Sequence, residues 1–472
     1  MSAATASPWH RGERELQQSV GVAERMEVFG RQVIRDFMPE QHRAFYRQLP
    51  FLVIAAVDAS GDPWATLVEA RSGLAQSADA RHLQINALPG RGDPAGDALM
   101  PGDGIGVLGI ELQTRRRNRV NGRVVARDDR QLTLQVEHAF GNCPQYIQAR
   151  AFRFSGDPAE PFVGRTEVLV KLDAEASAMI GAADTFFVAS YVDPEGDAGR
   201  RQVDASHRGG KAGFVRIDGD VLTIPDFAGN LHFNTLGNLR VNPRAGLLFI
   251  DFANGDLLQL TGRTELVLAG DEVSSFQGAE RLWRLYVDKA VRRRGVLKLR
   301  WRLDEVSPNS LMTGSWEEAL ARQQAQALRN QWRRFRIARI TNESSTIKSF
   351  HLEAADGAGL PLFKAGQHLP IRLAIAAEAA PVIRTYTLSA APSDGCYRIS
   401  VKREGRVSQF LHDHTAVGDE IEARAPLGNF VVDPHERRPL VLLSAGVGIT
   451  PMLAMLREVV YEGVRTRRVR QT

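Results

Sequence analysis

The chain has 472 residues, of which 43% are hydrophobic and 24% are charged. This length predicts about two to four domains, and the composition excludes a largely disordered protein. The net charge of +5 is small for the length. The Arg-rich stretches at 114–119 and 464–470 form no basic stripe with aromatic side chains, which argues against a nucleic-acid binder.

Cysteine content and hydropathy exclude further classes. Cys143 and Cys396 are too few for a disulfide scaffold, and an iron–sulfur cluster held by thiolates needs about four cysteines. No apolar run approaches the roughly 18 residues of a membrane span, and the N-terminus lacks an apolar signal core. We therefore predict a cytoplasmic protein without a membrane segment.

Residues 1–50 are predicted to form a helical N-terminal segment. Apolar residues recur at steps of three and four, which indicates a packing face on a helix. Pro39 and Pro50 interrupt this pattern. The predicted face consists of Val22, Met26, Phe29, Val33 and Phe37.

Two strand-rich segments then repeat one another, which predicts an internal duplication at 51–170 and 171–310. FLVIAAVDASGD, from Phe51, aligns without a gap with FFVASYVDPEGD, from Phe186. IGVLGIELQ followed by VNGR recurs as AGLLFIDFA followed by LTGR, so that Gly122 aligns with Gly262. Two matches in the same order indicate a repeated unit of about six strands.

Each copy is predicted to form a small barrel. An Asp-x-x-Gly-Asp turn joins two apolar strands in each copy, which suits a hairpin. Short strands separated by turns favour a closed barrel over a sandwich, because closure removes unpaired edges. Two such copies in one chain can pack as an internal pseudo-dimer.

A helical linker is predicted at 311–332, where SWEE reads as an N-cap followed by first-turn carboxylates. Strand-like segments at 333–435 predict an antiparallel barrel. From 436 to 472 the sequence reads as the start of an α/β domain. There the apolar strand LVLLS runs into glycines, and Thr450-Pro451 begins a helix.

The barrel at 333–435 contains RTYTLS, at 384–389, which has the chemistry of a flavin site. Alternate side chains of a strand share a face, so Arg384 and Tyr386 should point together. Tyr386 could stack on the flavin ring, Arg384 could hold a phosphate and Thr387 could bond N5. Taken alone, the motif is explained equally well by an ordinary exposed strand.

Two glycine-containing motifs complete the pattern. In VKREGRVSQFLHDH, Gly405 allows a tight turn and Ser408 could cap a helix that begins at Gln409, whose N-terminus suits a pyrophosphate. A plain capped helix is the alternative. In SAGVGITP, Gly446 and Gly448 would admit a dinucleotide phosphate. The order of these motifs is more specific than any one of them.

Residues 333–460 closely resemble the ferredoxin–NADP reductase superfamily, most of all the reductase half of flavohaemoglobins. The resemblance implies FAD in contact with Arg384, Tyr386 and Thr387, the last two also being catalytic. His368 stands where relatives often have Tyr, so that flavin contact differs. Further implied FAD contacts are Val401, Lys402, Val407 and Ser408, and implied NAD(P)H contacts are Gly446, Val447, Gly448, Ile449, Thr450 and Pro451.

The same resemblance implies a nicotinamide domain that extends on the order of 100 residues beyond the glycine-rich loop. The sequence ends at Thr472. The expectation is therefore an incomplete nicotinamide domain, in which reduction of the flavin by NAD(P)H needs residues outside this sequence.

Residues 45–305 resemble the pyridoxamine-5′-phosphate-oxidase-like split barrel, through SHRGGKAGFVRI, IPDFAGNLHFNTLGNLRVNPRAGLLFIDF and LTGR. The resemblance implies FMN between the two repeats. Its candidate contacts are Arg208, Lys211, Asn230, Asn234 and Thr235. The Arg and Lys strand pattern of the true oxidases is absent, so pyridoxamine oxidase activity is not expected. A barrel that has kept its fold but no cofactor is the alternative.

Two basic features nearby are predicted to be structural. His207 and His232 lack carboxylate or cysteine partners at ligand spacing, so we expect hydrogen-bonded histidines and no metal. RRRNR, at 115–119, could meet a phosphate, but a solvated hairpin face is the commoner explanation.

The predicted fold is mainly β with α/β: two split β-barrels in an internal pseudo-dimer, an antiparallel flavin-binding barrel, and the start of a Rossmann-like domain. The predicted function is a flavin-dependent oxidoreductase that passes electrons from NAD(P)H through FAD to an acceptor. That acceptor is the split-barrel half, with FMN as a further cofactor, or a carrier such as ferredoxin. A homo-oligomer is a further expectation. The alternative is a non-catalytic flavin- or ligand-binding protein whose reductase part is a scaffold.

Overall fold

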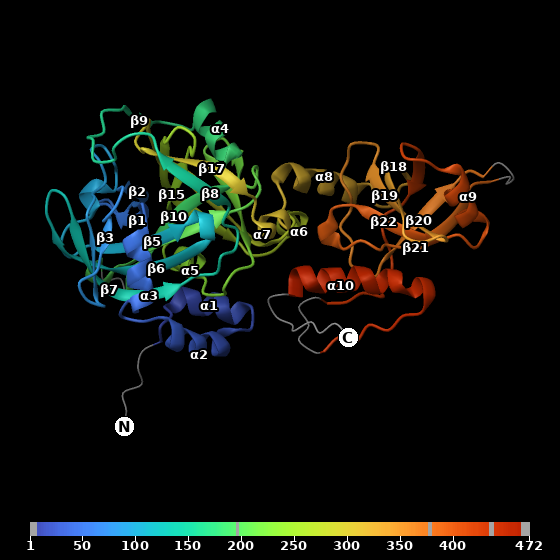
Figure 1. The fold of residues 1–472 in the computed structure, drawn as a ribbon, viewed down its shortest axis with the longest axis horizontal. Helices are drawn as coiled ribbons and strands as arrows, with labels where there is room; N and C mark the ends of the chain where they lie inside the picture. The colour runs from blue at the N-terminus through green and yellow to red at the C-terminus, as the bar shows by residue number, and fades with distance from the viewer. Residues whose placement is uncertain (1–6, 195–197, 376–379, 434–438, 464–472) are drawn as a thin grey trace, which may run out of the picture. The chain divides into compact units, whose positions relative to one another are not determined.

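The computed structural model describes residues 7–194, 198–375, 380–433 and 439–463, and the chain divides into two compact units (Figure 1). Unit 1 comprises Met1–Trp316 and unit 2 comprises Glu317–Thr472. Within the described ranges, no helix is both long enough and apolar enough to cross a membrane.

Three helices form the N-terminal segment of unit 1: α1 (Arg11–Ser19), α2 (Ala23–Val33) and α3 (Glu40–Gln48). Helix α1 packs closely on α5 (Asn234–Val241), since a Cβ added to Gly12 would lie 2.1 Å from the Gly237 carbonyl oxygen. The predicted single apolar face is wrong in part. Met26 is buried, but Phe29 and Phe37 are 43% and 38% exposed. Phe37 follows the end of α2, so the helical spacing does not extend to it.

Two antiparallel sheets follow, and they have the same strand order. The first runs β2-β1-β5-β6-β7-β4-β3 and the second runs β11-β10-β14-β15-β16-β13-β12. Adding nine to each label of the first order gives the second, which confirms the internal duplication. The first sheet consists of β1 (Phe51–Val57), β2 (Pro63–Glu69), β3 (Ala75–Gln76), β4 (His82–Ile85), β5 (Gly104–Glu111), β6 (Arg116–Arg127) and β7 (Leu132–Gly141).

The second sheet consists of β10 (Thr185–Val192), β11 (Gln202–Gly209), β12 (Arg216–Asp218), β13 (Val221–Phe227), β14 (Arg244–Ile250), β15 (Leu257–Val267) and β16 (Ala279–Arg293). Strand β9 (Thr166–Leu169) pairs with β16, and β8 (Ala149–Phe154) pairs with β17 (Leu299–Glu305). These two pairings join the copies. Short helices complete the unit: α4 (Ala174–Ala182), α6 (Asp271–Ser275), α7 (Pro308–Leu311) and the turns η1 (Gly96–Ala98), η2 (Leu112–Thr114) and η4 (Ala198–Arg200).

A glycine occupies the same β-bulge in each copy. The register shifts between Asn121 and Gly122 in β6, and between Thr261 and Gly262 in β15. A Cβ added to Gly122 would lie 1.9 Å from the Gln135 carbonyl oxygen, and one added to Gly262 would lie 2.0 Å from that of Tyr286. The repeated VNGR and LTGR motifs therefore specify a close backbone approach that only glycine allows.

Replacing Gly262 with alanine is expected to lower the free energy of unfolding of unit 1 by about 1–3 kcal/mol or more, because the added methyl group meets a backbone oxygen that cannot rotate away. Denaturant unfolding measures the change. Gly181→Ala in α4 is the control, since a Cβ there meets no atom within 4 Å. Equal stabilities of the two variants would contradict this account of the bulge.

The register corrects the alignment of the first strands of the repeats. Ala55 pairs with Gly106, and Ala189 pairs with Gly246. Because the two glycines are equivalent, Ala55 corresponds to Ala189. The gap-free match of Phe51 with Phe186 is thus displaced by one residue. Such a displacement exchanges the two faces of a strand, so it would have assigned each side chain to the wrong core.

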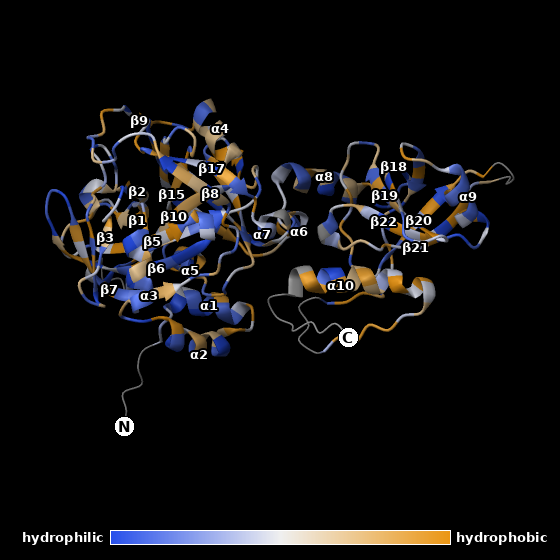
Figure 2. Ribbon diagram, in the orientation of Figure 1, coloured by the Kyte–Doolittle hydropathy of each residue, from blue (hydrophilic) through white to orange (hydrophobic). Residues whose placement is uncertain are grey.

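Strands β1 and β10 are buried on both faces, which explains their unbroken apolar sequences. Leu52 and Ile54 belong to the core of the first copy. Val53 from β1 meets Phe187 and Leu248 of the second copy in a core that the two repeats share. The two copies therefore share a hydrophobic core. Figure 2 shows hydrophobic stretches, in orange, among the strands of unit 1.

Unit 2 contains a six-stranded antiparallel sheet in the order β21-β20-β23-β18-β19-β22. An isolated bridge between Leu388 and Ile399 joins the two ends of this order, so the sheet curls into a barrel. Its strands are β18 (Arg333–Asn342), β19 (Ile347–Ala354), β20 (His368–Leu373), β21 (Val382–Thr387), β22 (Tyr397–Lys402) and β23 (Glu420–Ala423). Its helical elements are α8 (Trp316–Ala327), α9 (Arg406–His414), α10 (Ile449–Gly463) and the turns η5 (Pro392–Asp394) and η6 (Gly446–Gly448).

The predicted strand LVLLS is not formed. Residues 439–445 are irregular, and Val441 and Leu443 are 75% and 81% exposed. A parallel strand needs neighbours for its backbone N–H and C=O groups, and no strand of the described ranges pairs with this segment. The start of a Rossmann-like sheet is therefore wrong for the described residues. The helix predicted at Thr450-Pro451 is present as α10, beginning at Ile449.

Candidate functional sites

The first four residues of the RTYTLS motif, Arg384 to Thr387, lie on β21, at an end of the strand order of unit 2. Arg384 and Tyr386 lie opposite Ile371 and Leu369 of β20 and share a face, as predicted. The Arg384 guanidinium is exposed and donates to the Ile383 carbonyl oxygen at 2.8 Å. Tyr386 is half-buried against the barrel core, and burial raises the pKa of its hydroxyl. The strand thus presents an exposed cation beside a packed aromatic ring.

The bridge that closes the barrel brings this strand toward helix α9. Strands β21 and β22 run antiparallel from the Leu388–Ile399 bridge. Along β21 the chain runs back from the bridge to Arg384, while along β22 it runs forward to Lys402 and then to α9. Arg384 and the N-terminus of α9 therefore lie toward the same end of the two strands.

Helix α9 begins earlier than predicted. It starts at Arg406 with Gly405 as N-cap, so Ser408 is the third helical residue rather than the cap. The Ser408 hydroxyl accepts from the backbone N–H groups of Glu404 and Gly405 at 3.0 and 2.9 Å. This bond holds the turn before the helix. The N–H groups of the first helical turn have no partner within an α-helix, which is the geometry that binds phosphate groups.

Three predicted flavin contacts are restricted by what they already touch. The side chains of Val401 and Val407 lie in the barrel core, so only their backbones can face a ligand. The Val401 carbonyl oxygen also bonds His412 Nε2 at 2.8 Å. Lys402 Nζ donates to Glu404 Oε1 at 3.1 Å.

His368 begins β20 opposite Thr387. It bridges to Leu427, and a Cβ on Gly428 would lie 3.0 Å from His368 Nδ1. Gly428, in the APLGNF segment, has a φ of +116°, so glycine at this position keeps space beside the imidazole. Thr387 and His368 are therefore adjacent, as a shared flavin contact requires.

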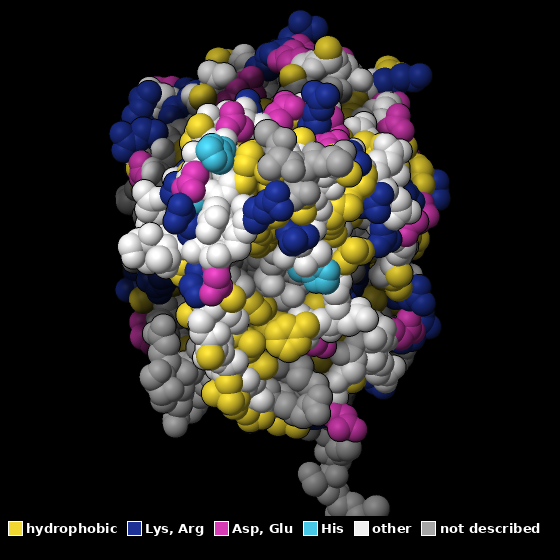
Figure 3. Space-filling view, turned by 90° about the vertical axis from the view of Figure 1, so that its right-hand side faces the viewer, with side chains coloured by type: hydrophobic (Ala, Val, Ile, Leu, Met, Phe, Trp, Pro, Cys, Tyr) yellow, Lys and Arg dark blue, Asp and Glu magenta, His cyan; other side chains and the backbone are white. Residues whose placement is uncertain are grey.

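The glycine-rich segment forms the turn η6 and leads into α10. Gly446 has a φ of +55°, and Thr450 Oγ1 donates to the Val447 carbonyl oxygen at 2.9 Å. Val447 and Ile449 are about half exposed. On the face drawn in Figure 3, apolar side chains gather into a patch beside Lys and Arg side chains. The turn and the first helical residues, Gly446 to Pro451, are thus presented at the surface of unit 2.

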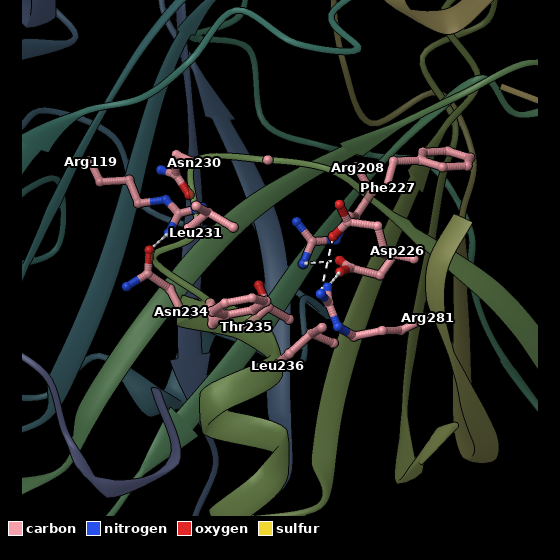
Figure 4. A pocket seen from close by; sticks show the side chains of 13 residues that line it. Arg119, Arg208, Asp226, Phe227, Asn230, Leu231, Asn234, Thr235, Leu236 and Arg281 are labelled. Carbon is pink, nitrogen blue, oxygen red and sulfur yellow. Dashed lines mark hydrogen bonds and ion pairs between the residues drawn. The ribbon is translucent and has the colours of Figure 1, made fainter. Parts of the chain in front are cut away.

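In unit 1, a pocket lies between the two repeats. It has a volume of about 80 Å³, and Figure 4 shows Arg119 from the first copy pointing toward Asn234 of the second. Arg208, Asn230, Asn234 and Thr235, four of the five predicted FMN contacts, line it, whereas Lys211 does not. The structure therefore brings the predicted polar residues together at the inter-repeat position, except for Lys211.

Several of these residues are already engaged. Arg119 donates to Asp204 at 3.0 Å, to Asn234 at 2.8 Å and to the Ser206 hydroxyl at 2.6 Å. The Thr235 hydroxyl also bonds that of Ser206, at 2.7 Å. Asn234 and Thr235 are therefore parts of a buried network that positions Arg119.

A second pocket of about 80 Å³ adjoins the first. Three arginines line each pocket, Asp226 lines both, and Glu280 lines the first alone, so the second has the larger excess of positive charge. Arg117 and Arg119 from β6 and His207 and Arg208 from β11 line it, together with Cys143. Burial lowers the pKa of Arg117 to about 9, and repulsion from the nearby Arg119 is a second, smaller cause of this shift. Burial and the neighbouring arginines hold the pKa of His207 well below its usual value. Positive charge is concentrated here at an electrostatic cost that a bound anion would relieve.

Polar atoms around this second pocket lack hydrogen-bond partners. Among the described residues, Arg117 Nε, Arg208 Nε, His207 Nε2 and Asn142 Nδ2 are buried without one. The backbone is also strained there. Of the four non-glycine residues with positive φ in the described ranges, Tyr146, Leu231 and Phe233 line these two pockets. Unpaired donors and local strain are typical of a binding site.

The sequence offers RRRNR, at 115–119, as a possible phosphate contact but favours a solvated hairpin face, so Arg117 and Arg119 are not among its predicted site residues. That explanation holds for Arg116, which is exposed, but is wrong for Arg119, which is 5% exposed. The side chains alternate along β6, so Arg117 and Arg119 share the face that meets the second copy. The sequence signal for this shared face is the two-residue spacing of Arg117 and Arg119, shortly before Gly122 at the β-bulge.

The two histidines differ. His207 Nδ1 lies 3.2 Å from Arg117 Nη1, as expected of a hydrogen-bonded residue. His232 is surrounded by Trp9, Phe29 and Phe140, with ring centroids 5.0–5.9 Å away, and burial lowers its pKa to about 4. Its Nδ1 is buried without a partner among the described residues, so the predicted hydrogen bond is not formed at that nitrogen. Within the same ranges, no group of metal-binding side chains is present.

Glu13 links the pocket network to pH. Its carboxylate accepts from Asn234 at 2.7 Å, and burial raises its pKa to about 8. The folded protein therefore holds this proton more tightly than the unfolded chain. The stability that the proton confers is complete below pH 4.5 and is lost as pH rises toward 8.

We therefore expect wild-type protein to lose stability relative to Glu13→Gln between about pH 5 and pH 8, by about 1.4 kcal/mol per pH unit at most. Unfolding free energies measured across this range test it. Glu24→Gln, at an exposed position of α2, should follow the wild-type profile. Parallel profiles for wild type and Glu13→Gln would contradict the prediction.

Comparison with known proteins gives matches to part of the chain. Residues 334–432 match the family model "Oxidoreductase FAD-binding domain". The flavohemoprotein of Pseudomonas aeruginosa is 54% identical over 128 residues, which are 27% of this chain and 32% of that protein. The flavohemoprotein of Bacillus subtilis is 45% identical over 138 residues, which are 29% and 35% of the two chains. The chain thus spans about a third of the length of these curated relatives.

Among solved structures, the FAD/NAD-binding domain of nitric oxide dioxygenase from Vibrio cholerae is 38% identical. The match has a TM-score of 0.27 and covers 28% of this chain and 59% of that one. The family match falls on the strands that carry Arg384, Tyr386 and Thr387 and on helix α9. Residues 334–432 are therefore an FAD-binding oxidoreductase domain with homology to flavohemoproteins.

Proposed function

We propose that this protein is a flavin-dependent oxidoreductase in which unit 2 binds FAD, accepts electrons from NAD(P)H and passes them to an acceptor. The observation that carries the proposal is the FAD-binding domain match over residues 334–432, together with the exposed Arg384 and packed Tyr386 inside it. When bound, FAD supplies electron exchange between a nicotinamide and other carriers.

Different residues of unit 2 would bind different parts of FAD and of the nicotinamide dinucleotide. Arg384 would pair with a phosphate, and the first-turn N–H groups of α9 would receive the pyrophosphate. Tyr386 would stack on the flavin ring, with Thr387 and His368 at its edge. Gly446 to Pro451 would approach the dinucleotide. The proposed acceptor is unit 1 or a separate carrier such as ferredoxin.

The test is the visible spectrum of purified full-length protein supplied with FAD, before and after anaerobic addition of NADH or NADPH. A bound flavin band that either nucleotide bleaches is the expected result. Protein that takes up no FAD would overturn the proposal. A bound flavin that neither nucleotide bleaches would favour a non-catalytic flavin-binding protein, with the barrel of unit 2 as a scaffold.

A second candidate function belongs to unit 1, where the inter-repeat pockets support a bound phosphate ester such as FMN. The unpaired donors of Arg117, Arg208 and Asn142 favour an anion. The volume of each pocket suits a phosphate group rather than a whole flavin, whose sites are typically several hundred Å³. The ring would therefore lie outside the pocket. Mass spectrometry of released cofactors should then find FMN beside FAD, and FAD alone would count against this assignment.

The remaining assignments rest on the same proposal. They are a split-barrel identity for the two repeats, a cytoplasmic location, a homo-oligomer, and domains at 1–50, 51–170, 171–310, 311–332, 333–435 and 436–472. Size-exclusion chromatography with light scattering tests the oligomer, and limited proteolysis tests the domain limits.

A further inference from the structure

We propose that unit 1 binds one phosphate-class anion per chain, because the second inter-repeat position has been closed by an internal ion pair. This inference rests on the proposed anion site between the repeats. A duplicated fold with a pseudo-two-fold arrangement offers two equivalent positions, so a single site requires that one of them has been lost.

The bulge glycines identify the equivalent residues on the long strands. Arg119 lies three residues before Gly122, and Gln259 lies three residues before Gly262. Arg117 corresponds in the same way to Leu257. We call the pocket lined by Arg117, Arg119, His207 and Arg208 the open pocket. At the equivalent position in the other copy, the neutral amide Gln259 replaces Arg119, and the buried Leu257 replaces Arg117.

The hairpin strands β2 and β11 give the other equivalents. Ala65 pairs with Ala55, and Ala205 pairs with Ala189, so these two positions correspond. Counting on from them, Ser206 corresponds to Thr66. His207 and Arg208 correspond to Leu67 and Val68, which are 4% and 3% exposed. Apolar side chains therefore replace the polar wall of the open pocket.

A buried carboxylate fills the closed position. Asp93 accepts from Gln259 Nε2 at 3.1 Å, from the Thr66 hydroxyl and from Arg293 Nη1 at 2.6 Å. The side chains of Asp93 and Arg293 are 0% and 1% exposed. Asp93 thus supplies a buried negative charge from within the chain at the closed position, where it pairs with Arg293.

Arg293 completes the correspondence. The bulge pairs Asn121 with His138 and Thr261 with Lys289, so Arg293, four residues beyond Lys289, corresponds to Asn142. On the open side Asn142 Nδ2 is buried without a partner among the described residues, whereas on the closed side the arginine meets Asp93. At the closed position the charge of Arg293 is paired with Asp93, although Arg293 Nε and Gln259 Oε1 are buried without partners among the described residues. The other position keeps unpaired donors on Arg117, Arg208 and Asn142 for an external oxyanion.

The test is equilibrium dialysis of labelled inorganic phosphate against the 472-residue protein saturated with FAD and held in excess NADP⁺, so that both proposed nucleotide sites of unit 2 are occupied. One phosphate per chain is expected. Arg117→Met/Arg208→Met should weaken binding at least about tenfold, as loss of charged hydrogen bonds predicts. The matched control on the closed side, Asp93→Asn/Arg293→Met, should keep one phosphate with affinity within about twofold.

Two phosphates per chain, or loss of binding in the closed-side variant alone, would overturn the single-site inference. No binding by wild-type protein would overturn the anion site itself. Competition identifies the source of the anion. Displacement by FMN but not by riboflavin supports a flavin phosphate, whereas displacement by neither keeps the single anion site and removes FMN from the proposed function.

Discussion

Asp93→Ala is expected to lower the free energy of unfolding of unit 1 by about 3–5 kcal/mol. The substitution leaves Arg293 buried without its carboxylate, and it removes the acceptor of Gln259 and Thr66. Burial already lowers the pKa of Arg293, which shows the cost of keeping that charge inside. Urea unfolding followed by tryptophan fluorescence measures the change, because every tryptophan except Trp332 lies in unit 1.

Asp304→Ala is the matched control for this variant. Asp304 pairs with Arg302 at 3.0 Å, but the Arg302 side chain is 82% exposed, so the pair is screened by water. Its loss should change the unfolding free energy by less than about 0.5 kcal/mol. A shift of similar size in both variants would mean that the Asp93–Arg293 pair contributes no more than a surface pair.

Arg384→Ala is expected to raise the dissociation constant for FAD about 10- to 100-fold. This corresponds to the roughly 1.5–3 kcal/mol of a hydrogen bond to a charged group. The guanidinium is exposed and its bond to the Ile383 carbonyl is local, so its removal should leave the barrel folded. Titration of FAD into the apoprotein, followed by flavin fluorescence, gives the constant.

Arg336→Ala is the control on the same sheet. Arg336 lies on β18 and pairs with Glu353 at 3.1 Å, and both side chains are more than half exposed. It carries the same charge as Arg384 outside the FAD-binding residues. Equal weakening by the two variants would indicate a non-specific effect of net charge and would remove Arg384 from the phosphate site.

The predictable features were those fixed by local chemistry. The first four residues of RTYTLS lie on a strand and alternate between its faces as predicted. VNGR and LTGR repeat because each glycine avoids a backbone clash. The one-residue displacement between β1 and β10 was not predictable, since both strands are buried on both faces and no alternation of polar residues marks the register. The paired strands β5 and β14 were needed to fix it.

The candidate sites were only partly predictable for a similar reason. Arg208 and Asn234 were found through a resemblance, but Arg119 comes from the other repeat, and its burial depends on a strand distant in the sequence. LVLLS is apolar enough for a buried strand. Its conformation depends on neighbouring strands, which the apolarity of one segment does not specify.

The covalent joining of the two repeats has a consequence for how such a molecule can change. In a dimer of identical chains, one substitution alters both symmetry-related interfaces at once. Here Asn142 and Arg293 occupy equivalent positions in the two copies but are encoded by separate codons, so each residue can change without the other. Asp93 could therefore become a permanent internal counter-ion on one side while the opposite side stayed available to ligands. Duplication within one chain thus allows a fold with two equivalent positions to keep a ligand site at only one of them.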